Sequence, residues 1–225
     1  MSPSSFIEER NALQLASLEA AVIDSAYNPK LRPGQGGEGD SLRRDVQRWV
    51  RTIVIFIAVI WIVGLVDAFV FGGQLRTYGI VPRSELGLRG ILFAPFLHAG
   101  IGHLIANTTG IMVFGGLVIL RGEAHFWLVT LVGALSSGIG TWLFGRPAYH
   151  IGASGVLFAY FGYLLFTGWF ERRLGSILLS VLVLIGWGST IFGVLPVHPA
   201  ISWEGHLFGL LGGVASARLL ARRSR

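Results

Sequence analysis

Long apolar segments alternate with short polar breaks along the chain after residue 48. The first segment, 52–71, is about 20 residues long, which is enough to cross the hydrocarbon core of a bilayer. Its one charged residue is Asp67. Five more apolar segments follow and end at glycines, prolines or charged residues. The pattern predicts six membrane-spanning helices, at about 52–71, 102–120, 126–144, 154–170, 176–195 and 204–221.

The composition supports this interpretation. Hydrophobic residues make up 52% of the 225 residues, and charged residues only 13%, about half of the quarter that is usual in soluble proteins. A soluble core of this size cannot bury so much apolar surface while so few charges cover the outside. We therefore expect an all-α, multi-pass integral membrane protein, a six-helix bundle in contact with the lipid bilayer of the cell membrane. A disordered chain, a disulfide scaffold and a water-soluble enzyme are excluded.

The basic residues predict the orientation of the chain. They flank the apolar segments rather than line one face, which argues against a nucleic-acid partner. With six spans, fourteen of the 18 fall on the side of the N-terminus and four on the other side. The four are Arg76, Arg83, Arg89 and Arg146. Because cytoplasmic loops are enriched in Lys and Arg, both termini are expected to be cytoplasmic.

The chain is expected to have three parts. These are an N-terminal cytoplasmic segment, 1–48, a six-helix domain, 49–221, and a basic cytoplasmic tail, 222–225. In the N-terminal segment, Ser5–Glu8 has the pattern of a capping box and predicts a short helix to about Ile23. A linker rich in proline and glycine follows at 28–37.

Polar side chains inside a predicted span are costly and therefore require an explanation. His103 and Asn107 are four residues apart near the start of the second span and share one helical face. His98 comes five residues earlier and is expected in the turn before the helix. A metal site is one interpretation, but no carboxylate or third helical histidine completes a ligand set, so no metal or cofactor is predicted. Hydrogen bonding between helices is the structural alternative.

The motif Gly152-Ala153-Ser154-Gly155 opens the fourth predicted span. A serine between glycines is not shielded by neighbouring side chains, and another backbone can approach it closely. Small residues are common at helix contacts, however, so the motif alone is weak support for a nucleophile. A single histidine in a span, such as His206 in the sixth, is likewise more often a satisfied polar contact.

Two helix faces made of small residues would allow Ser154 to approach His206. The bare face of the sixth span holds Gly209 and Gly213, and that of the fourth holds Gly155 and Ala159. If these faces pack backbone to backbone, Ser154 and His206 come within hydrogen-bonding distance. His206 would then take the proton of Ser154, and the hydroxyl would attack a carbonyl group. His103, Asn107 and the Ser154 backbone N–H are suitable donors for the tetrahedral oxygen that forms.

No acid completes a catalytic triad. Glu204 is two residues from His206, so on a helix its side chain points elsewhere. Another group must orient the imidazole, and Phe158, one turn beyond Ser154, can stack against it. The residues therefore predict a Ser–His dyad.

These motifs resemble those of the rhomboid intramembrane serine proteases. The motifs are His98-x-x-x-x-His103-x-x-x-Asn107, Gly152-Ala153-Ser154-Gly155 and His206-x-x-Gly209. Each is weak alone, but their order on the second, fourth and sixth spans makes the resemblance specific over about 50–220. It implies a serine endopeptidase that cleaves single-pass transmembrane proteins near the non-cytoplasmic face, within a water-filled cavity. The implied roles are Ser154 as nucleophile, His206 as base, His103 and Asn107 as oxyanion stabilisers, and His98, Gly152, Gly155, Phe158 and Gly209 as supporting residues.

The chain departs from the family pattern at two points, and two other functions are alternatives to proteolysis. The aromatic residue that packs on the catalytic histidine is often Tyr in the family and is Phe158 in this chain, and a Trp-Arg pair in the first loop has no match. A catalytically inactive rhomboid-like protein that binds or escorts transmembrane segments typically lacks the serine or the histidine, and this chain has both. A transporter with Asp67, His103 and His206 as a polar path would not explain the Gly-Ala-Ser-Gly motif.

Overall fold

The computed structural model describes residues 14, 17, 38–199 and 201–223. The capping box predicted at 5–8 lies outside the described residues, as does the helix predicted to Ile23 except for residues 14 and 17. The chain divides into two compact units, 1–47 and 48–225. The site described below belongs to the second unit.

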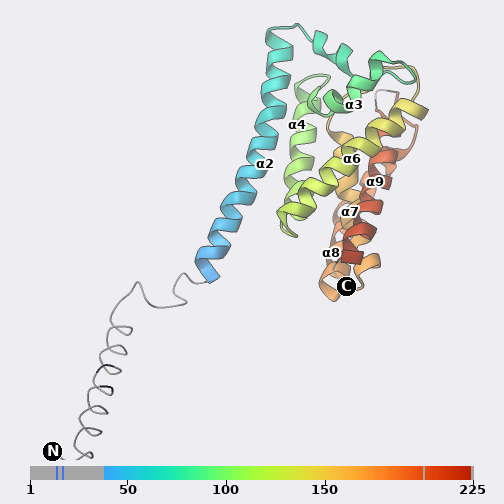
Figure 1. The fold of residues 1–225 in the computed structure, drawn as a ribbon. Coiled ribbons are helices and arrows are strands. Elements are labelled where there is room, and N and C mark those ends of the chain that lie inside the picture. The colour runs from blue at the N-terminus through green and yellow to red at the C-terminus, as the bar shows by residue number, and fades with distance from the viewer. Residues whose placement is uncertain (1–13, 15–16, 18–37, 200, 224–225) are drawn as a thin grey trace, which may run out of the picture. The chain divides into compact units, whose positions relative to one another are not determined.

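The described residues form helices joined by short connections (Figure 1). In chain order the helices are α2 (Glu38–Phe69), η1 (Gln74–Tyr78), η2 (Leu86–Arg89), α3 (Gly90–Phe93), η3 (Ala94–Phe96), α4 (Ile101–Gly110), η4 (Ile111–Gly115), α5 (Gly116–Ile119), α6 (Glu123–Phe144), α7 (Ser154–Glu171), α8 (Leu174–Trp187), η5 (Gly188–Val194) and α9 (Trp203–Arg223). The π-helical turn η4 joins α4 and α5 into one helical stretch. No strand occurs among the described residues, only a single antiparallel bridge between Ile80 and His150.

Four helical stretches are long and apolar enough to cross a membrane. They are Gly39–Phe69, Ile101–Ile119, Glu123–Phe144 and Leu174–Val194. These stretches coincide with the first, second, third and fifth predicted spans. In the described part of the chain α7 and α9 are not among them, so the predicted count of six spans is not confirmed.

Helix α7 differs from the four apolar helices because it lies inside the bundle. It contacts α4, α6, α8 and α9 (Figure 1), and 12 of its 18 residues are buried. A helix that faces protein on most sides does not need a uniformly aliphatic surface, and α7 accordingly carries tyrosines, glycines and Thr167. This composition fits its central position.

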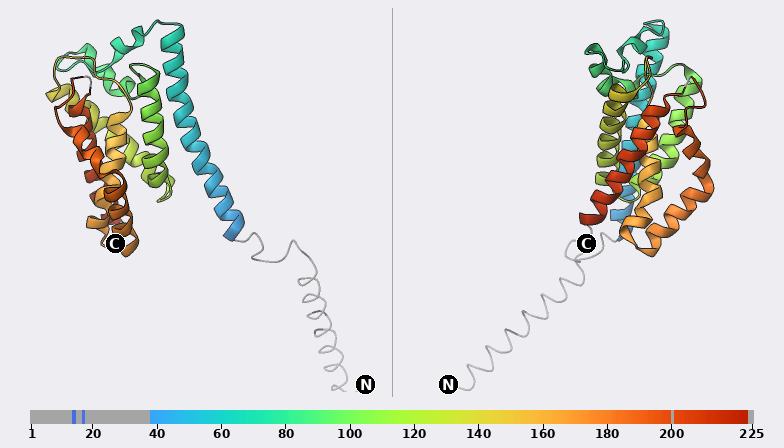
Figure 2. Two further views of the ribbon diagram at one scale, coloured as in Figure 1. Left: turned by 180° about the vertical axis from the view of Figure 1, so that it is seen from behind. Right: turned by 90° about the vertical axis from the view of Figure 1, so that its right-hand side faces the viewer.

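Helices α7 and α9 lie side by side (Figure 2) and pack backbone to backbone. A Cβ atom on Gly209 would lie 2.1 Å from the carbonyl oxygen of Gly155, and one on Gly213 would lie 2.0 Å from that of Ala159. The faces of small residues predicted from the sequence are thus confirmed. Because Gly209 and Gly213 carry no side chain, the backbone of α9 lies directly against the backbone of α7 at Gly155 and Ala159.

The connection between α2 and α4 contains four short helices, where the hydropathy pattern predicts only a break between the first and second spans. Its turns are tightly packed, since a Cβ atom on Gly90 would lie 2.3 Å from the backbone nitrogen of Ile80. Backbone hydrogen bonds in both directions between Ile80 and His150 tie this connection to the loop that precedes α7. The connection therefore helps to fix the start of α7.

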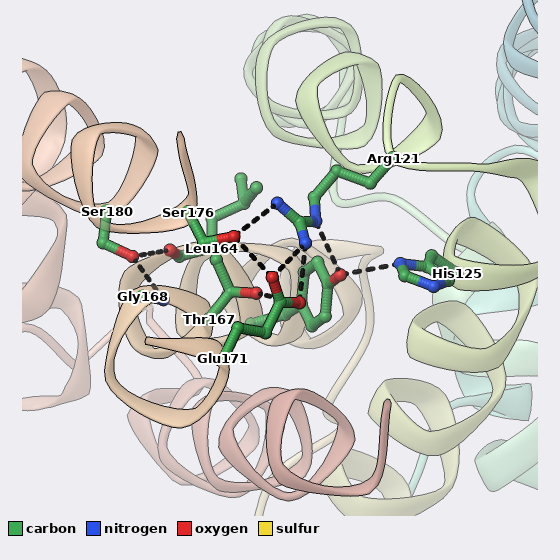
Figure 3. A network of polar contacts seen from close by, with 9 residues as sticks. Arg121, His125, Leu164, Thr167, Gly168, Glu171, Ser176 and Ser180 are labelled. Atoms are coloured by element: carbon green, nitrogen blue, oxygen red, sulfur yellow. Dashed lines mark hydrogen bonds and ion pairs between the residues drawn. The ribbon is translucent and has the colours of Figure 1, made fainter. Parts of the chain in front are cut away.

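A polar network ties the helices together at the far end of α7 (Figure 3). Arg121, just after α5, donates hydrogen bonds of 2.6 and 2.7 Å to the carboxylate of Glu171, the last residue of α7. Glu171 also accepts a hydrogen bond from Ser176 of α8. His125 of α6 and Arg121 both contact the hydroxyl of Tyr163. The network joins α5, α6, α7 and α8 at the end of α7 opposite Ser154.

Candidate active site

Ser154 and His206 lie in direct contact. Ser154 is the first residue of α7, and His206 lies in the first turn of α9. The Nε2 atom of His206 is 2.8 Å from the Ser154 hydroxyl oxygen. The Nδ1 atom is 2.9 Å from the carbonyl oxygen of Gly193, in η5. Because a carbonyl can only accept, Nδ1 carries the proton of a neutral imidazole and Nε2 is left to accept the proton of Ser154.

Phe158 holds the other side of the His206 ring. The two rings are stacked, with centroids 4.1 Å apart and an interplanar angle of 9°, which is the packing that the sequence suggested. Gly193 completes this arrangement, since a Cβ atom there would lie 2.5 Å from the Phe158 ring. The sequence analysis missed Gly193, because a backbone carbonyl acceptor leaves no signal in residue type.

Two hydrogen-bond donors converge beside Gly152, two residues before Ser154. The backbone N–H of Ala99 donates to Nδ1 of His103 at 3.3 Å, which makes Nε2 the protonated nitrogen of that neutral ring. A Cβ atom on Gly152 would lie 2.7 Å from this Nε2 atom and 3.6 Å from Nδ2 of Asn107. The Asn107 Nδ2 atom is buried and has no hydrogen-bond partner among the described residues. A buried donor without a partner is costly, and this one is available to a ligand.

A cavity of about 740 Å³ lies over these groups. Its lining includes all four polar residues that the sequence assigned to the reaction, namely Ser154, His206, His103 and Asn107. His150 also lines it and is 2.6 Å from the Ser202 hydroxyl through Nδ1. In the described part of the chain no three His, Asp or Glu side chains are grouped to hold a metal ion. The cavity thus joins a serine–histidine pair to two N–H donors.

Comparison with known proteins identifies the family. The model of the Rhomboid domain matches residues 86–223, more than half of the chain. The chain belongs to the rhomboid family.

Relatives of this rhomboid occur in several bacteria. An uncharacterized protein of Mycobacterium tuberculosis is 39% identical over 190 residues, which cover 79% of each chain. An uncharacterized protein of Mycobacterium leprae is 37% identical over 209 residues, 88% of this chain and 82% of the relative. Bacillus subtilis YdcA, named as a candidate rhomboid protease, is 36% identical over 126 residues, 52% of this chain and 59% of its own. With the four apolar helices, the family match makes the chain an integral membrane protein.

His98 of this rhomboid lies in the turn before α4, as the sequence predicted. Its ring is 4% exposed, and its centroid is 5.1 Å from that of His103. Its Nδ1–H donates to the carbonyl oxygen of Phe96 at 3.2 Å. Burial, and next the charge of His103, lower the pKa of His98 to about 4. A neutral His98 therefore supports the His103 ring and does not line the cavity.

Glu204 points away from His206, as the sequence predicted, and its partner is Arg146. The carboxylate is 2% exposed, accepts the backbone N–H of Arg146 at 3.0 Å and lies 3.3 Å from its guanidinium. Arg146 also donates to the carbonyl oxygens of Pro199 and Ile201, at 2.9 and 2.6 Å. This ion pair ties the loop between α6 and α7 to the segment before α9. The sequence analysis missed it because its two partners are 58 residues apart.

Proposed function

We propose that this rhomboid is an intramembrane serine endopeptidase that cleaves transmembrane proteins through a dyad of Ser154 and His206. The observation that carries the proposal is the chain of contacts from the Gly193 carbonyl through the imidazole to the Ser154 hydroxyl. Because Nδ1 donates to this carbonyl, the unprotonated Nε2 atom of His206 faces the Ser154 hydroxyl. An inactive rhomboid that only binds helices would have no need of this proton arrangement.

The reaction follows from these contacts. His206 Nε2 takes the hydroxyl proton while the Ser154 oxygen attacks the substrate carbonyl. The oxyanion is stabilised by His103 Nε2–H and Asn107 Nδ2–H, and one such donor is worth about 10²–10³ in rate. The tetrahedral intermediate collapses as His206 returns the proton to the leaving amine. Water, activated by His206, then hydrolyses the acyl-enzyme in the same way.

The predicted topology suggests where cleavage occurs. With six spans and cytoplasmic termini, the start of α7, and with it Ser154, lies near the non-cytoplasmic face of the cell membrane. A substrate helix must unwind to present an extended peptide to Ser154. Single-pass proteins whose helix begins with small or helix-weakening residues are therefore the expected substrates.

Reconstitution tests the proposal. Purified protein in liposomes is combined with single-pass model substrates whose helices begin either with Ala and Gly or with Leu. We expect one cut near the non-cytoplasmic end, faster for the Ala and Gly helices, and none with Ser154→Ala. Equal cleavage by Ser154→Ala would point to a contaminating protease. Binding of the substrates without any cleavage would favour the inactive, helix-binding alternative.

A further inference from the structure

The described side chains that line the large cavity include arginines and histidines but no carboxylate. Two arginines and three histidines contribute to its wall, and none of the described residues that line it is an aspartate or a glutamate. These basic residues are Arg76, Arg146, His103, His150 and His206. The wall therefore has no carboxylate of its own to balance a cation inside the cavity.

The two arginines differ in what already binds them. Arg146 forms an ion pair with Glu204 and donates to two backbone carbonyls. Its charge is therefore already balanced by a carboxylate that is not among the residues lining the cavity. Arg76, in η1, is exposed, and no described carboxylate lies within ion-pairing distance of its guanidinium. Among the described lining residues, Arg76 is therefore the arginine that offers a ligand in the cavity a guanidinium without a carboxylate partner.

Asp67 does not neutralise Arg76. The two residues line a smaller adjoining cavity of about 50 Å³, but no ion pair joins them. The Asp67 side chain is 4% exposed, and its Oδ1 atom accepts the backbone N–H of Leu75 at 2.8 Å. The Asp67 carboxylate thus stabilises the turn after α2, and the Arg76 guanidinium can still bind a carboxylate of a ligand.

We propose that Arg76 determines specificity by binding a carboxylate side chain that flanks the scissile bond, so that the preferred substrate segment is acidic at that position. The inference deepens the proposed function and rests on it. A cation at a cavity edge with low-dielectric walls attracts a carboxylate and repels an ammonium group. Because Arg76 is exposed, the gain in affinity is modest, and we expect about a threefold to tenfold effect.

Binding to the Ser154→Ala protein measures this preference without requiring catalysis. Fluorescent single-pass peptides carry Glu, Gln or Lys at one position, and the position is moved along the segment that flanks the expected cleavage site. At one or two neighbouring positions, the Glu peptide should bind about threefold to tenfold more tightly than the Gln peptide, and the Lys peptide less tightly. The difference should shrink in 0.5 M salt.

Changing the charge at residue 76 tests whether Arg76 causes the preference for the Glu peptide. Arg76→Gln should abolish the preference for Glu, and Arg76→Glu should reverse it in favour of Lys. Arg172→Gln removes the same charge at the opposite end of α7 and should leave the preference intact. Equal affinity of all peptides, no saturable binding, or a preference that survives Arg76→Gln would overturn the inference. A charge preference without cleavage by wild type would instead overturn only the proposed function.

Discussion

At the scale of single residues, Gly152 meets two constraints that another residue type cannot meet together. Its φ of +114° disfavours any side chain, and a Cβ atom would lie 2.6–2.7 Å from the His103 ring. Gly152→Ala should therefore displace His103 and reduce labelling by a fluorophosphonate probe about tenfold or more. Gly116→Ala is the matched control, because no atom lies within 4 Å of the added methyl group. Unchanged labelling of Gly152→Ala would show that this wall of the site is not required.

The lowered pKa of His98 predicts that the stability of the protein depends on pH. This pKa is lowered from 6.5 to about 4, so the unfolded chain binds more protons than the folded chain between these values. The free energy of unfolding should consequently rise with pH over this window, and acidification from pH 7 to 4 should cost up to about 3 kcal/mol. Thermal unfolding in detergent at several pH values measures this loss. His98→Gln should flatten the profile, and an unchanged profile would contradict the assignment.

At the scale of helices, the contact between α7 and α9 aligns the dyad. Gly209→Ala would insert a methyl group 2.1 Å from the Gly155 carbonyl oxygen and force the backbones apart. We expect a loss of stability of about 1–3 kcal/mol and a larger loss of probe labelling, since Ser154 and His206 separate. Gly186→Ala in α8 meets no neighbouring atom and should change neither quantity. A normally labelled Gly209→Ala protein would contradict this account.

The network in Figure 3 should stabilise the bundle without taking part in chemistry. Glu171 is 5% exposed and Arg121 20% exposed in their pair, so Glu171→Gln leaves a half-buried cation without its carboxylate and should cost about 1–3 kcal/mol. The pair of Arg48 and Glu123 is 52% and 30% exposed, and Arg48→Gln should cost less than about 1 kcal/mol. Thermal unfolding of the two variants measures the difference between these losses of stability. Probe labelling of Glu171→Gln well below its melting temperature should be normal, and its loss would mean that the network also shapes the site.

The sequence predicted those parts of the site that depend on residue type and spacing. His103 and Asn107 share a face because they are four residues apart, and the glycines of α7 and α9 indicate that two helices approach closely. The Gly193 carbonyl and the pairing of Arg146 with Glu204 could not be predicted in this way. Both depend on contacts between segments far apart in the chain, and a backbone acceptor is present at every residue.

At the scale of the whole molecule, hydropathy predicts the helices that face lipid and is less informative about those inside the bundle. The four stretches identified by length and hydropathy are mostly unburied, with only 6% of the window in Leu174–Val194 buried. Helix α7, in contrast, is surrounded by other helices and carries Ser154, the proposed nucleophile, at its first residue. The site is thus built where helices contact one another, and the family match to 86–223 includes each of its proposed residues.

The central claim is that His206 activates Ser154, and fluorophosphonate labelling of the purified protein tests it most directly. The probe forms a tetrahedral adduct on an activated serine, next to the donors of His103 and Asn107. The account predicts labelling of wild type at Ser154, located by mass spectrometry, and none of Ser154→Ala or His206→Ala proteins that melt like wild type. Equal labelling of the His206→Ala protein, or no labelling of folded wild type, would contradict it.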